Sequence, residues 1–225
     1  MNRGLFAAQL NEIEILLGRL ALLTERNYGA RYQDYGASDF KRLTYAEVWR
    51  KCYAERLFDY RLSDDALMQF RAINFRPLAV SYAFYEAPYE PMMYFEDFRD
   101  QERASRQADP DELSLARDYE LLEPELKERV TPIRYDFSPS EYTEGVHPAS
   151  HVHFGHRSEV RIGTRRILRP ISFVLLILRQ YYPAHWRLFL ALPEASTMCR
   201  NVLGGLERVA RQYWRPLDRN EMTLE

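Results

Sequence analysis

Apolar residues recur every three or four positions at the start of the chain, which predicts a helix over residues 5–25. A second helix is expected to begin after Thr44 and to run to about Leu57. Thr44 and Glu47 have the spacing of a capping box, in which each side chain pairs with a backbone amide of the first turn. The connection over residues 27–42, rich in tyrosine, is expected to be a packed loop.

From about residue 64 the hydrophobic period changes to two, because apolar and polar residues alternate over 68–72 and again over 78–84. This alternation predicts a β-hairpin. Three later segments are rich in β-branched or aromatic residues and are expected to extend the same antiparallel sheet: Ile133–Phe137, Ser150–Phe154 and Val160–Ile162. Between them and the hairpin, residues 96–128 carry twelve acidic and five basic side chains, which indicates a solvated and mobile insertion.

The C-terminal part again has helical spacing. Pro170 suits the first turn of a helix that Pro183 should end, and a last helix is expected from Pro193 to about Val209. The predicted fold is therefore a single α+β domain over residues 1–225, with an antiparallel sheet flanked by helices. Its parts are the N-terminal helices (1–60), the sheet with the acidic insertion (61–165) and the C-terminal helices (166–225).

Composition narrows the class of protein. The 31 basic and 33 acidic residues argue against a general electrostatic nucleic-acid binder, so any basic surface must be local. Cys52 and Cys199 stand far apart, which excludes a zinc-finger pattern and a disulfide framework. The N-terminus lacks signal-peptide features, and the longest apolar run is too short to cross a bilayer. We therefore expect a cytoplasmic protein without a membrane partner.

Candidate chemistry gathers in residues 147–156, which hold four of the five histidines. If residues 150–154 form a strand, His151 and His153 point to the same face. The two imidazoles could then bind a divalent metal, zinc by default, with a further ligand from His147, His156 or Asp136.

Three other interpretations of the histidines stay open. His151 and His153 could act as catalytic acid and base in phosphoryl transfer. The segment could instead be a binding pocket without chemistry, for a nucleotide, a nucleic acid or an acidic partner. In both cases the ligand contacts are expected to come from the arginines that follow and the outer histidines: Arg157, Arg161, Arg165, Arg166, His147 and His156. Finally, the histidines could be hydrogen-bonded members of a half-buried sheet, with the arginines solvated.

The block from His147 to Gly155 has the form H-P-x-x-H-x-H-x-G and is followed by Arg161-Ile162 and by the helix that Pro170 begins. With the hairpin segments around residues 64–70 and 82–88, it resembles an uncharacterised bacterial family, a domain of unknown function. The resemblance implies a small accessory protein, linked to mobile or antiviral defence loci, without an assigned activity.

Two hypotheses follow from the sequence. In the first, the protein binds or processes a phosphate-bearing ligand, a nucleic acid or nucleotide, through the histidines and arginines. In the second, it is a non-enzymatic subunit of a multi-protein complex, which its helices join. The sequence leaves open whether the protein is an enzyme and whether it holds a metal.

Overall fold

The computed structural model describes residues 1–28, 40, 42–89, 126–157, 160–219 and 223–224. The chain forms two compact units, one of residues 1–86 with 131–225 and one of residues 87–130. In the smaller unit, Tyr89 and Leu126 form an antiparallel bridge, and the Lys127 amide donates to the Pro88 carbonyl at 2.8 Å. The predicted acidic insertion lies almost wholly outside the described residues, as does most of the predicted loop over 27–42.

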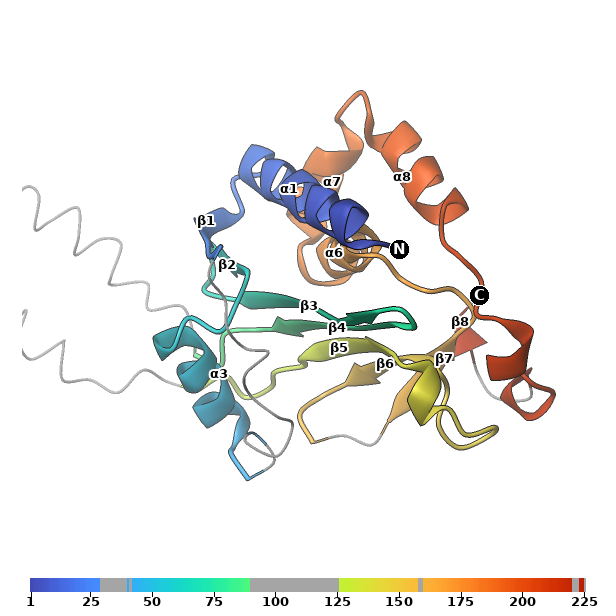
Figure 1. Ribbon diagram of the computed structural model, residues 1–225. Coiled ribbons are helices and arrows are strands. Elements are labelled where there is room, and N and C mark those ends of the chain that lie inside the picture. Colours follow the sequence, from blue (N-terminus) through green and yellow to red (C-terminus); the bar gives the residue numbers. More distant parts are fainter. Residues whose placement is uncertain (29–39, 41, 90–125, 158–159, 220–222, 225) are drawn as a thin grey trace, which may run out of the picture. The chain divides into compact units, whose positions relative to one another are not determined.

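The larger unit is built on one sheet whose strands are ordered as they occur in the chain (Figure 1). Seven strands pair antiparallel in succession, and a short eighth strand pairs parallel with the seventh. The strands are β1 (Leu23–Arg26), β2 (Tyr60–Leu62), β3 (Leu67–Phe75), β4 (Leu78–Tyr85), β5 (Ile133–Phe137), β6 (Ser150–Phe154), β7 (Arg161–Thr164) and β8 (Thr223–Leu224).

Helices cover the two faces of this sheet unequally (Figure 1). Four helices lie on one side: α1 (Arg3–Arg19), α6 (Pro170–Tyr181), α7 (Pro183–Leu190) and α8 (Ala195–Gly204). Helix α3 (Tyr45–Ala54) lies on the other side, toward the β2 end. The predicted α+β architecture is confirmed, with an antiparallel sheet and helices at both ends of the chain.

The main core lies between the sheet and α6. Pro170 occupies the first turn of this helix, where its missing amide costs no hydrogen bond. Phe173 is fully buried, and its ring packs against those of Phe70 and Tyr82, with centroids 6.0 and 5.9 Å away. The side chains of β3 and β4 that face α6 are therefore the apolar members of the predicted alternation of apolar and polar residues.

Helix α3 begins as the sequence predicts. The Glu47 amide donates to Thr44 Oγ1 at 3.3 Å and the Thr44 amide donates to Glu47 Oε2 at 2.6 Å, which completes the capping box. Cys52 and Trp49 point toward the sheet: Gln69 Nε2 on β3 donates to Cys52 Sγ at 3.5 Å, and Trp49 Nε1 donates to the Asp65 carbonyl. Helix α3 thus closes one end of the second face.

Several predicted element boundaries were wrong. The first helix ends at Arg19, because Ala21 has a positive φ of 53° and the chain then enters β1. Pro183 ends α6 but also begins α7, since proline is as well suited to a first helical turn as to a helix end. The last helix stops at Gly204, short of Val209. The strand predicted over Val160–Ile162 is β7, which runs from Arg161 to Thr164.

Candidate functional site

The face of the sheet opposite α6 carries polar side chains in two adjacent cross-strand rows. Because pairing partners in neighbouring strands point to the same face, the register defines these rows. The first runs through Arg71, Ser81, Asp136, His151 and Gly163, and the second runs through Gln69, Ala83, Arg134, His153 and Arg161. The two histidines that were predicted to share a face therefore do so, with an aspartate and an arginine from β5 beside them.

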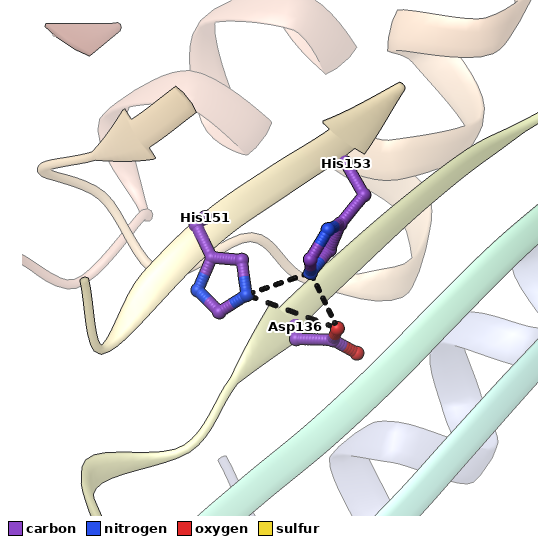
Figure 2. A group of neighbouring side chains, drawn as sticks. All are labelled: Asp136, His151 and His153. Atoms are coloured by element: carbon purple, nitrogen blue, oxygen red, sulfur yellow. Dashed lines mark hydrogen bonds and ion pairs between the residues drawn. The ribbon is translucent and has the colours of Figure 1, made fainter. Parts of the chain in front are cut away.

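Three of these side chains converge on one point (Figure 2). The Nε2 atoms of His151 and His153 lie 2.9 Å apart. Asp136 Oδ2 lies 3.3 Å from His153 Nε2 and 3.9 Å from His151 Nε2. The histidines are buried, with 1% and 5% of their surface exposed. We call Asp136, His151 and His153 the histidine–aspartate cluster.

His151 is held in one tautomer by the backbone. Its Nδ1 lies 2.6 Å from the Pro148 carbonyl oxygen, which can only accept, so Nδ1 carries the proton. Burial, assisted by the nearby His153, lowers the pKa of His151 to about 4. At neutral pH this imidazole is therefore uncharged, and its Nε2 presents a lone pair to the cluster.

Asp136 remains ionised although it is largely buried. Burial alone would raise its pKa, but the hydrogen bond with His153, the charge of Arg134 and a hydrogen bond from Ser81 outweigh it and hold the pKa of Asp136 well below its usual range. The cluster thus contains a carboxylate anion next to a neutral imidazole.

Arg134 adds a positive charge at the edge of the cluster. Its Nε donates to Asp136 Oδ2 at 2.7 Å, and its Nη2 lies 3.0 Å from His153 Nε2. About half of the Arg134 side chain is exposed, so the guanidinium can reach solvent or a ligand. On the other side of His153, Arg161 pairs with it across β6 and β7 and is also exposed.

The outer histidines have different surroundings. The His147 ring meets that of His151 edge to face, with centroids 4.8 Å apart, and its buried Nδ1 has no hydrogen-bond partner in the part of the chain that the structure describes. His156 Nε2 donates to the Leu43 carbonyl at 2.9 Å, and Arg157 donates to the same oxygen at 2.6 Å. His156 and Arg157 thus tie the turn after β6 to the start of α3.

Arg166 binds the C-terminal segment through its side chain, and Arg165 does so through its backbone. Arg166 Nη1 donates to the Leu206 carbonyl at 3.1 Å, and the Arg165 carbonyl accepts from the Val209 amide at 3.0 Å. Of the four predicted arginines, only Arg161 lies in a row with the histidines. The sequence pattern missed Arg134 and Ser81, because they come from other strands and only the register brings them to the site.

These features define a class: an α+β protein with a sequentially ordered antiparallel sheet and a buried histidine–aspartate cluster on the face opposite its main core. The chain belongs to the family of uncharacterised conserved proteins DUF2290, whose model matches residues 25–208. No curated protein and no solved structure matches the chain. Within the described residues, no helix has the length and apolar character needed to span a membrane.

Proposed function

We propose that the protein binds and processes a phosphate-bearing ligand, a nucleotide or nucleic acid, on the face of β5, β6 and β7. The observation that carries this proposal is the row in which Arg134 and Arg161 flank His153. Since neighbouring strands are about 4.8 Å apart, the two arginine Cα atoms are separated by roughly 10 Å. Long guanidinium side chains can span that gap and meet at one phosphate group above the imidazole.

The chemistry of the row suits a phosphate. Guanidinium groups form paired, charge-assisted hydrogen bonds with phosphate oxygens, and a histidine–aspartate cluster beneath them supplies groups that can transfer a proton or bind a metal. The net charge of the whole chain is −2, so attraction of an anion depends on this local arrangement. Arg134 and Arg161 thus replace Arg157, Arg165 and Arg166 as the proposed phosphate contacts.

Ligand binding by arginine variants tests the proposal. We expect the purified protein to bind members of a panel of nucleotides and short single-stranded oligonucleotides at low salt. Arg134→Gln and Arg161→Gln should each weaken binding about tenfold or more, because a charge-assisted hydrogen bond contributes roughly 1.5–3 kcal/mol. Arg179→Gln, at the exposed end of α6, is the matched control and should leave the dissociation constant unchanged.

The same experiment separates this function from the second hypothesis. Absence of binding across the panel, or equal effects of the Arg134, Arg161 and Arg179 variants, would contradict a phosphate site on this face. That outcome would favour a non-enzymatic subunit, such as a component of a defence complex. In that case His151→Ala combined with His153→Ala would act only through stability or assembly.

A further inference from the structure

We infer that Asp136, His151 and His153 bind one divalent transition metal ion, zinc in the first place, through His151 Nε2, His153 Nε2 and an Asp136 carboxylate oxygen. The inference deepens the proposed function and rests on it in placing the reacting centre at this cluster. Binding of the ion itself requires no phosphate ligand, so the two can fail separately.

The three ligand atoms form a triangle of the size that a zinc ion requires. With sides of 2.9, 3.3 and 3.9 Å, the circle through the two nitrogens and the oxygen has a radius of about 2.0 Å. Zinc bonds to imidazole nitrogen and carboxylate oxygen measure about 2.0–2.2 Å. An ion at or just above the centre of the triangle would reach all three atoms without movement of the strands.

The protons of the cluster cannot be placed so that every contact is a hydrogen bond. His151 Nε2 and Asp136 Oδ2 can only accept hydrogen bonds, so His153 Nε2 would have to donate to them. Arg134 Nη2, a donor, also points at His153 Nε2 from 3.0 Å. If that nitrogen accepts from Arg134 instead, it has no proton for His151, and two lone pairs face each other at 2.9 Å. No arrangement of protons satisfies all these contacts, whereas a cation among the lone pairs of His151, His153 and Asp136 would satisfy those three groups once Arg134 turns away.

Hydrogen bonds with neighbouring groups hold two of the three ligands in place. Histidines that bind metals usually donate their other ring nitrogen to a carbonyl or carboxylate, which fixes the tautomer and the ring orientation. His151 does so through Nδ1 and the Pro148 carbonyl. Asp136 is likewise held by a hydrogen bond from Ser81. Two imidazoles and one carboxylate form a ligand set used for catalytic zinc, in which further coordination positions remain for a substrate.

Arg134 should affect the binding of a metal ion and of a phosphate ligand in opposite directions. Its guanidinium contacts Asp136 and His153, so it occupies the same negative side of the cluster that a metal ion would use. An incoming ion must displace it or bind against its charge. Removal of this charge should therefore strengthen metal binding, while the same change should weaken the binding of a phosphate ligand.

The test is a zinc titration of the full-length protein after removal of metal with a chelator. Zinc bound in competition with a chromophoric chelator should reach one ion per chain. His151→Ala, His153→Ala and Asp136→Ala should each weaken binding at least a hundredfold. His185→Ala, on α7, leaves four histidines, as His151→Ala and His153→Ala do, and should bind zinc as the unaltered protein does. Circular dichroism identifies any variant that fails to fold, and His151→Gln or Asp136→Asn then takes its place.

Arg134→Gln separates the two proposals, because the expected changes have opposite signs. Zinc affinity should rise several-fold, and affinity for a nucleotide, measured on the chelator-treated protein, should fall. Binding of less than one zinc per chain, or equal zinc binding by the His151 and His185 variants, would overturn the metal site and leave the phosphate proposal standing. Weaker zinc binding by Arg134→Gln would also overturn it.

Discussion

Two buried polar clusters lie one residue apart on the same strands and face opposite sides of the sheet. Tyr135 and Ser150 precede Asp136 and His151, and they point toward α6 instead of away from it. Tyr135 Oη pairs with Ser150 Oγ at 2.9 Å and accepts from the Leu168 amide at 2.9 Å, and Ser150 Oγ pairs with Thr164 Oγ1 at 2.6 Å. We call Tyr135, Ser150 and Thr164 the hydroxyl cluster.

The difference between the clusters is in what their atoms can do. A hydroxyl group donates and accepts, so three hydroxyls can satisfy one another and the neighbouring backbone. At the atoms that meet, the ionised Asp136 carboxylate and the His151 imidazole can only accept hydrogen bonds. Their neighbour His153 cannot donate to them through Nε2 and also accept from Arg134 there. Buried polar groups that are fully paired stabilise a fold, and those that are not call for an additional partner. Pairing, more than burial, thus distinguishes a structural cluster from a candidate site.

The largest expected effect is a loss of folding stability in acid, caused by the histidine–aspartate cluster. The pKa of His151 is lowered from 6.5 to about 4 in the folded chain, so the unfolded chain binds more protons between these values. Stability of the chelator-treated protein should therefore fall as pH drops from about 6.5 to 4, by about 3 kcal/mol at most. Asp136, whose pKa is held below its usual range, should add a further loss below about pH 4.

Urea unfolding at several pH values measures this loss. His151→Asn removes the imidazole and should flatten the stability profile between pH 6.5 and 4, while the decline below pH 4 remains. A profile with the same slope before and after this substitution would show that His151 is not a buried neutral base, and the contrast between the two clusters would lose its main support.

A smaller effect is expected from the hydroxyl cluster. Tyr135→Phe removes the oxygen that pairs with Ser150 and with the Leu168 amide, and should destabilise the fold by about 1–3 kcal/mol because it leaves buried polar groups unpaired. Urea unfolding at neutral pH measures the change. Tyr53→Phe, on the exposed side of α3, is the matched control and should stay within about 0.5 kcal/mol.

The face of the sheet opposite α6 should tolerate the loss of a buried polar group better than the hydroxyl cluster does. His153→Gln removes a nitrogen whose contacts cannot all be satisfied, so we expect a loss below about 1 kcal/mol in the chelator-treated protein. If this substitution costs more than Tyr135→Phe, the histidine–aspartate cluster is a stabilising network and the contrast is wrong.

The smallest expected effect is on the reactivity of the Cys52 thiol, where α3 covers the face of the sheet opposite α6. Burial between α3 and the sheet raises the pKa of the Cys52 thiol to about 12, whereas Cys199 on α8 is only partly buried. A thiol reagent at pH 8 should label Cys199 in the native protein and Cys52 only after unfolding. Cys199→Ser should abolish the native reaction. Rapid labelling of Cys52 would mean that α3 does not close that end of the sheet.

Much of the sheet could be predicted because its signals are local. The strands Ile133–Phe137 and Ser150–Phe154 have the predicted boundaries, since β-branched and aromatic residues alternate there between turns. The same period of two placed His151 and His153 on one face. Asp136 was named with His147 and His156 as a possible further ligand, but only the pairing of Asp136 with His151 brings its carboxylate to the two histidines.

The parts that could not be predicted depend on contacts between distant segments. Strand β1 follows α1 after only three residues, and its pairing with β2 overrides the apolar spacing that favoured a longer helix. No sequence pattern singled out Arg134, because its place beside His153 depends on strand register. Arg157 appeared to belong to the site by proximity in sequence, but it binds the Leu43 carbonyl.

The chain leaves the larger unit after β4 and re-enters it before β5, and both places are held by hydrogen bonds. The Thr131 amide donates to Glu86 Oε2 at 3.4 Å, and the hydroxyls of Tyr45 and Tyr181 bind the carbonyls of Glu86 and Thr131. Glu86 and Thr131, at which the chain leaves and re-enters the larger unit, are thus held by contacts within that unit. The register that aligns Asp136 with His151 is therefore fixed by the larger unit's own contacts.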